Sequence, residues 1–155
     1  MNIGFYLPNI NQQIEEHRYI VENINKLCEL RPYDHIVIFN NYFQLMDSNK
    51  KYYILSANHA KYFRGILFLF DTQSAFLTQT FPGPDKQILY MQTPEWAERS
   101  NVPYMMWHNI YLNNKFETLA GNDDIAKLLD ICWKPPLAKI DKFNYKEVNN
   151  VIQRI

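Results

Sequence analysis

Short apolar runs alternate with longer, two-sided segments along this chain. The most continuous run, Gly65–Phe70, is apolar at every position up to Asp71, and Gln87–Met91 is a second short run, apolar from Ile88 onward. Runs this short that are apolar on both faces are typical of strands buried on both sides. Between them, Ser74–Thr80 is long enough for about two helical turns, and Pro82–Asp85 ends it. This strand–helix–strand unit predicts two parallel strands joined by a crossover.

The amino-terminal part of the chain repeats the pattern. Ile3–Leu7 and His35–Phe39 are apolar runs that end at Pro and Asn residues. The segment from about Gln12 to Leu30 has apolar residues at helical spacing and charged residues on its other side, which predicts a two-sided helix. A polar connection, Asn41–Lys51, leads to a third predicted strand at Tyr52–Leu55. The apolar face of the helix comprises Ile14, Tyr19 or Ile20, Ile24, Leu27 and Cys28.

The carboxyl-terminal part continues in the same way. Phe116–Ala120 and Leu137–Ile140 are predicted strands, and between them Ile125, Leu128, Leu129 and Cys132 form a predicted buried helical stripe. Further helices are predicted at Ala60–Phe63, Pro94–Glu98, Tyr104–Leu112 and Tyr145–Ile155. Alternating strands and helices of this kind predict a three-layer α/β fold. We therefore expect a Rossmann-like, open, mostly parallel sheet of about six to seven strands, with helices on both faces, in one domain spanning residues 1–155.

Composition and charge narrow the range of partners. Sixteen basic residues balance sixteen acidic residues, so no overall field favours nucleic acid, which we do not expect to bind. No apolar run approaches the roughly 20 residues needed to span a bilayer, and the first residues lack the pattern of a signal peptide. The sequence thus predicts a cytoplasmic protein with no membrane partner. Cys28 and Cys132 both fall in helical apolar patterns, which predicts that they are reduced and buried.

The carboxyl ends of parallel strands are where ligands bind in open α/β sheets, and polar residues follow several predicted strands. Asp71 directly follows the apolar run Gly65–Phe70, where it is either a general base or the N-cap of the next helix. His59 follows the third strand and is the second catalytic candidate, because an imidazole titrates near neutral pH. For His59 the alternative is an ordinary surface or packing histidine.

Six further polar residues at these ends are candidates for substrate binding. The alternative for each is turn and helix-cap chemistry, which polar residues at strand ends also serve. For Glu95 the alternative is that it begins a helix beside Trp96, a core residue. The six candidates are Asn9, Asn40, Asn58, Gln92, Glu95 and Asn122.

Several familiar signatures do not occur in the sequence. Pro8-Asn9-Ile10-Asn11 stands where a dinucleotide-binding fold has its glycine-rich turn, and there is neither a Walker loop nor a GxSxG elbow. The four histidines and two cysteines lack metal-ligand spacing, so no metal site is predicted. No resident cofactor is expected.

Three stretches, IGFYLPN at the start, ILYMQTPEW in the middle and LAGNDDIAKLLDICW near the end, together with the order of elements, carry a resemblance. The chain resembles the amino-terminal Rossmann-like half of GT-B glycosyltransferases, and most closely the divergent versions in bacteriophage genomes. The resemblance implies an acceptor-binding half-site, with a nucleotide-sugar donor as a substrate. In that family a second Rossmann-like domain supplies most donor contacts, and this sequence has no counterpart of it.

Two functions therefore stay open, and with them the question of whether the chain is an enzyme. The first is a glycosyltransferase-like domain in which Asp71 or His59 deprotonates an acceptor, with a partner chain supplying the donor half. The second is a non-catalytic structural or protein-interaction module that reuses the fold, as a homo-oligomer or with another chain. The abundance of Tyr, Trp and Met favours the second. If the gene belongs to a phage, the compartment is the host cytoplasm or the virion.

Overall fold

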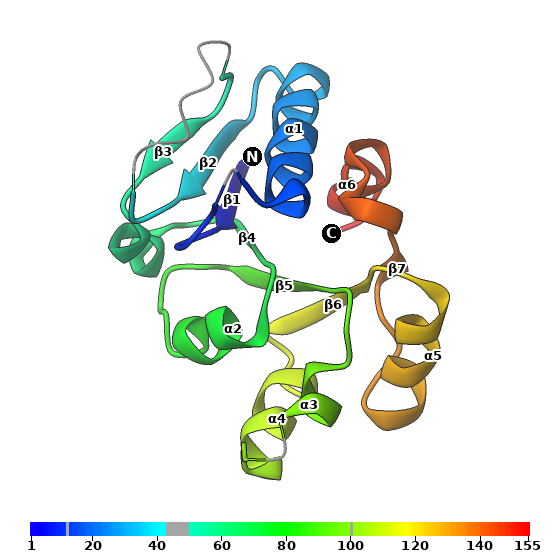
Figure 1. The fold of residues 1–155 in the computed structure, drawn as a ribbon. Helices are drawn as coiled ribbons and strands as arrows, with labels where there is room; N and C mark the ends of the chain where they lie inside the picture. Colours follow the sequence, from blue (N-terminus) through cyan, green and yellow to red (C-terminus); the bar gives the residue numbers. More distant parts are fainter. Residues whose placement is uncertain (12, 43–49, 100) are drawn as a thin grey trace.

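A computed structural model describes residues 1–155 except 12, 43–49 and 100. The described residues form a single seven-stranded sheet in the order β3-β2-β1-β4-β5-β6-β7, and all neighbouring strands run parallel. Helices cover both faces, so the predicted three-layer Rossmann-like fold is confirmed (Figure 1). The strands are β1 (Asn2–Tyr6), β2 (His35–Phe39), β3 (Tyr53–Leu55), β4 (Ile66–Leu69), β5 (Lys86–Met91), β6 (Phe116–Ala120) and β7 (Ala138–Lys139).

Helices connect the strands in the positions that the sequence predicted. Asp71 caps the helix after β4, and Asn122 caps the helix after β6, each with a side-chain oxygen. The predicted connection Asn41–Lys51 lies mostly outside the described residues. The helices are α1 (Glu15–Leu30), α2 (Thr72–Thr78), α3 (Glu95–Glu98), α4 (Tyr104–Tyr111), α5 (Asp123–Cys132) and α6 (Tyr145–Ile152), with short 3-10 helices η1 (Ala57–Tyr62) and η2 (Asp141–Phe143).

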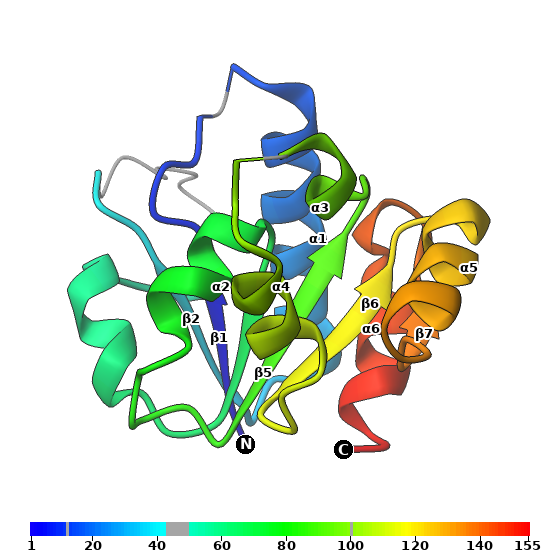
Figure 2. The same ribbon diagram turned by 90° about the horizontal axis from the view of Figure 1, so that it is seen from below.

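Two hydrophobic cores lie on the two faces of the sheet, because successive residues of a strand point to opposite sides. Phe5 and Phe68 join the core beneath α1 and α6, where their rings stack at 5.2 Å between centroids. Tyr6 and Leu69, the next residue along each strand, join the opposite core beneath α2, α4 and α5. Figure 2 shows both chain termini at the amino ends of the strands.

The structure corrects three burial predictions for helices, the first being Ile14, which was predicted on the buried face of the first helix and is exposed. Cys28 is buried in α1, but Cys132 is exposed, and so is Leu128 on the same helix. Helix α5 packs near the edge of the sheet, beside the two-residue strand β7, so it buries a narrower stripe formed by Ile125 and Leu129. None of the helices in the described part of the chain is long and apolar enough to cross a membrane.

Candidate functional site

The strand order reverses its direction of winding between β1 and β4. The chain passes from β1 outward to β2 and β3, then returns to the other side of β1 to form β4, β5 and β6. In such sheets the connections leave a crevice beyond the carboxyl ends of the two strands at the reversal. The fold therefore places its natural binding position beyond Tyr6 and Leu69.

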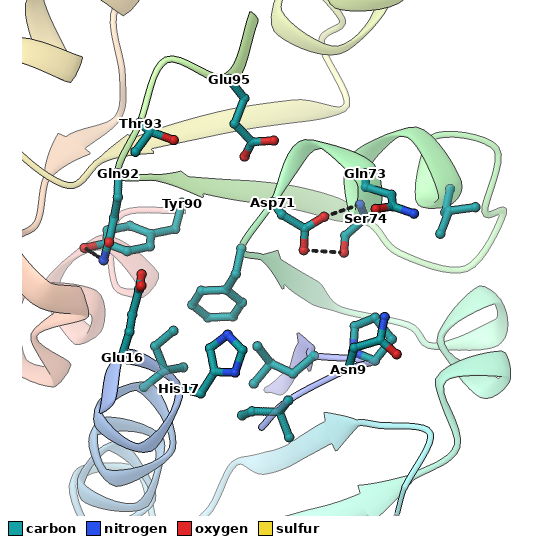
Figure 3. Close-up of a pocket in the computed structure, with 16 residues that line it drawn as sticks. Asn9, Glu16, His17, Asp71, Gln73, Ser74, Tyr90, Gln92, Thr93 and Glu95 are labelled. Atoms are coloured by element: carbon teal, nitrogen blue, oxygen red, sulfur yellow. Dashed lines mark hydrogen bonds between the residues drawn. The ribbon is translucent and has the colours of Figure 1, made fainter. Parts of the chain in front are cut away.

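A cavity of about 400 Å³ lies at this position and is here called the switch-point cavity. That volume is within the range of small-molecule sites. Its walls come from the ends of β1, β4 and β5 and from the first turns of α1 and α2 (Figure 3). The residues that line it are Leu7, Pro8, Asn9, Ile10, Glu16, His17, Ile20, Phe70, Asp71, Gln73, Ser74, Leu77, Tyr90, Gln92, Thr93 and Glu95.

Asp71 is held in place by the helix that it caps. Its Oδ1 accepts a hydrogen bond from the Ser74 backbone N–H at 2.6 Å, and its Oδ2 accepts from the Ser74 hydroxyl at 2.9 Å. Each carboxylate oxygen can accept a further bond, so the cap leaves Asp71 able to contact a ligand. Burial, with a further contribution from the Asp71 charge, raises the pKa of the nearby Tyr6.

Glu95 occupies the same helix terminus from another part of the chain. Its carboxylate accepts a hydrogen bond from the Thr72 backbone N–H at 3.2 Å and another from the Thr72 hydroxyl. Arg99, one turn later, lies 3.7 Å from it. The two carboxylates therefore accept from two N–H groups in the first turn of α2, those of Thr72 and Ser74, where the helix dipole favours negative charge.

Tyr90 forms part of the cavity wall and is fixed by three hydrogen bonds. Its hydroxyl accepts from the Phe143 N–H at 3.0 Å and from Gln92 Nε2 at 3.4 Å, and donates to the Ile140 carbonyl at 3.2 Å. Burial raises the pKa of Tyr90. The phenol therefore stays protonated at neutral pH and ties the end of β5 to the segment after β7.

His17 faces the cavity from the first turn of α1 (Figure 3). The Asn11 backbone N–H donates to its Nδ1 at 2.9 Å. This hydrogen-bond pattern assigns the neutral ring's proton to Nε2, so His17 presents a donor. Glu16, its neighbour, also faces the cavity, and it is an acceptor.

Four of the residues predicted from strand ends gather at this cavity: Asn9, Asp71, Gln92 and Glu95. Asn40 does not line it: its side chain is fully buried, donating to the Leu7 carbonyl and accepting from the Tyr42 N–H, both at 2.6 Å. Asn58 and the catalytic candidate His59 are exposed on η1. Asn122 caps α5, and its Nδ2 lies 3.4 Å from the Gln92 carbonyl, behind the cavity wall.

Sequence reasoning missed Glu16 and His17, which α1 brings to the cavity. Their position in the sequence could have indicated them. In such a fold the helix that follows the first strand begins beside the reversal of strand order, so its first-turn residues lie near the binding crevice. The residues described hold no group of three His, Cys, Asp or Glu side chains arranged to bind a metal ion. No protein-family model, curated protein or solved structure matches the chain.

Proposed function

We propose that this chain is a glycosyltransferase-like, acceptor-side domain whose switch-point cavity binds an uncharged carbohydrate. The lining of the cavity supports this proposal: it combines carboxylates, amides and hydroxyls, and its described residues include no Lys or Arg. A sugar hydroxyl both donates and accepts, so it needs partners of both kinds. Glu16 and Asp71 supply acceptors, and His17 supplies a donor.

The same lining disfavours a phosphate-bearing ligand. Rossmann-like folds hold phosphates on the free N–H groups of a helix N-terminus. Here Asp71 and Glu95 accept from the Ser74 and Thr72 N–H groups of α2, and Glu15 and Glu16 stand in the first turn of α1. A diphosphate would meet several carboxylates with no arginine to pair with it among the described lining residues.

The donor in a transfer reaction would then come from elsewhere. Catalysis requires both reactants to be positioned together, so a second domain or a partner chain would supply the nucleotide sugar. Asp71 would contact the reacting hydroxyl of the acceptor and remove its proton. The exposed position of His59 on η1, away from the cavity lining, favours Asp71 for this role.

Isothermal titration calorimetry tests the proposal. Methyl glycosides of glucose, galactose, mannose and N-acetylglucosamine form the first panel, and UDP and UDP-glucose form the second. We expect at least one methyl glycoside to bind with a Kd of about 1 mM or below, which corresponds to roughly −4 kcal/mol. We expect no heat of binding from the nucleotides.

The matched variants are Gln92→Ala and Gln153→Ala. Gln92 lines the cavity, so its truncation should weaken binding about tenfold by removing one amide contact, worth roughly 1 kcal/mol or more. Gln153 lies at the opposite end of the fold, directly after α6 as its C-cap, and its truncation should change nothing. Binding of nucleotides but of no methyl glycoside would contradict the proposal.

Exposed apolar side chains favour the second candidate function, a non-catalytic interaction module. Ile131 is 80% exposed, and Tyr104 and Met105 are also exposed. They lie on α4 and α5, and Tyr104 of α4 stacks on Trp133, the residue that follows α5, at 5.6 Å between ring centroids. Sedimentation velocity should show self-association if this surface pairs with a second copy, and Ile131→Ser should weaken it. A monomer at all concentrations would count against this candidate.

A further inference from the structure

A second hollow adjoins the switch-point cavity and is here called the side groove. Its volume is about 440 Å³, and it lies between the first turns of α1 and the η2 segment. It shares Glu16, Ile20 and Gln92 with the switch-point cavity. The two hollows are therefore adjacent, and these three side chains border both of them. The side groove is lined by Ile14, Glu15, Glu16, Tyr19, Ile20, Gln92 and Lys142.

The wall of the side groove on the α1 side carries two apolar side chains that face solvent, Ile14 and Tyr19, beside Glu15 and Glu16. The sequence predicted Ile14, and either Tyr19 or Ile20, on the buried stripe of α1. The structure buries Ile20, whereas Ile14 is exposed and the Tyr19 side chain is 39% exposed in the groove. An aromatic ring with an accessible face suits the C–H groups on one side of a sugar ring, because both surfaces are apolar and nearly flat.

The opposite wall carries Lys142 on a strained turn. Lys142 has φ 48° and ψ 36°, and Phe143 has φ 51°, in the left-handed region that side-chain-bearing residues rarely adopt. Two such residues cost about 1 kcal/mol or more each. Tyr90, only 2% exposed, holds this turn through the Phe143 N–H and the Ile140 carbonyl.

Lys142 itself has an exposed side chain with no hydrogen bond or ion pair to any described residue. Its ammonium group is a donor of three hydrogen bonds. The wall is thus fixed by the same tyrosine that lines the switch-point cavity, and it presents a donor across from Tyr19.

We propose that the side groove is a second sugar subsite, so that the two adjacent hollows together take a saccharide of at least two linked units. This inference rests on the carbohydrate binding proposed above. The first unit occupies the switch-point cavity. The second lies on the Tyr19 ring, and Lys142 donates hydrogen bonds to its hydroxyls. Glu16 and Gln92 contact the ligand at the junction between the two units.

Titration of the ¹⁵N-labelled full chain with monosaccharides and their own disaccharides tests this inference. The pairs are glucose with maltose and cellobiose, N-acetylglucosamine with its β-1,4 dimer, and mannose with its α-1,2 dimer. We expect one disaccharide to bind at least about tenfold tighter than its monosaccharide, an additional 1.4 kcal/mol by the standard conversion. Amide signals of Tyr19 and Lys142 should shift with that disaccharide only.

Two variants locate the additional affinity. Tyr19→Ala should bring the disaccharide Kd to within about threefold of the monosaccharide Kd, which itself stays unchanged. Tyr33→Ala is the matched control, because Tyr33 is 95% exposed and lies in a separate hollow at the other end of α1. Lys142→Gly removes the donor but permits the left-handed backbone, so the turn should persist while disaccharide binding weakens severalfold.

The outcomes separate the two proposals. If a monosaccharide binds and no disaccharide binds tighter, the second subsite is overturned and the carbohydrate site stands. If Tyr19→Ala and Lys142→Gly both leave the disaccharide preference intact, the side groove is not the subsite. If no saccharide of any length shifts a signal, both proposals are overturned.

Discussion

The two ends of the sheet hold their carboxylates in different ways. At the amino end, Asp34 accepts hydrogen bonds from the Arg31 guanidinium and, at 2.6 Å, from the Met1 ammonium. The same guanidinium donates to Asn149 Oδ1 at 2.9 Å, which joins α1 to α6. At the carboxyl end, Asp71 and Glu95 accept mainly from hydroxyls and backbone N–H groups.

This difference marks the amino end as a stabilising site and the carboxyl end as the candidate binding site. A carboxylate paired with cations has its charge balanced within the fold. A carboxylate held by neutral donors is fixed in position but keeps its charge and spare lone pairs directed at the cavity. Changes at the amino end should therefore lower stability, and changes at the carboxyl end should mainly lower ligand binding.

The largest stability loss is expected from Gly65→Ala at the amino end. Gly65 has φ 137°, and an added Cβ would overlap the Asn2 carbonyl oxygen of the neighbouring strand β1. Backbone strain and this overlap should lower the free energy of unfolding by about 2–3 kcal/mol. Urea denaturation measures the loss. Arg64→Ala, one residue away and exposed, is the control and should stay within about 0.5 kcal/mol of the wild type.

A smaller loss is expected from Asp34→Asn. Burial alone would raise the pKa of Asp34, but hydrogen bonds from the Met1 ammonium and from Arg31 outweigh it and lower the pKa below its ordinary value. Replacing the carboxylate with an amide should cost about 1.5 kcal/mol at neutral pH, since hydrogen bonds to charged groups are the stronger ones.

The pH dependence of that loss has a definite sign. A lowered pKa in the folded state means that the carboxylate stabilises the fold above its unfolded pKa of about 3.9. The contribution is lost as pH falls through the folded value. Urea curves from about pH 7 down to about pH 3 should show the wild type and Asp34→Asn converging. A difference that stays constant over this range would show that the ion pair does not stabilise the amino end.

The smallest stability effects are expected at the carboxyl end. Asp71→Ala removes the N-cap of α2 and should cost about 1 kcal/mol. Asp71→Asn keeps an oxygen for the Ser74 N–H and should stay within about 0.5 kcal/mol of the wild type. Both should weaken saccharide binding at least about tenfold, because the carboxylate is lost in each. An Asp71→Asn protein that binds like the wild type would remove this carboxylate from the site.

Most of the fold could be predicted from the sequence because its signals are local. His35–Phe39, apolar from Ile36 onward, and the mixed run Phe116–Ala120 both lie between turn residues, and the structure has strands with these same bounds. The α5 stripe was predicted too wide, because periodicity does not reveal that a helix packs at the edge of a sheet. Cys132 is exposed for that reason.

The site was harder to predict because it depends on strand order. Asn9 and Asn40 follow predicted strands in the same way, yet Asn9 lines the cavity and Asn40 is buried between strand ends. Which strand ends border the crevice is set by pairings between distant segments, and one sequence does not encode these in its local pattern. Glu16 and His17 were missed because a polar first turn reads the same whether it faces solvent or a cavity.

The central claim is that the switch-point cavity at the carboxyl end of the sheet binds a saccharide. Chemical-shift mapping with the saccharide that binds best in calorimetry tests it most directly. The claim predicts shifts for the amides of Asn9, Gln73, Gln92 and Thr93 at the carboxyl end, and none for Arg31, Asp34 and Asn149 at the amino end. Shifts confined to the amino end, or no shifts with any saccharide, would contradict it.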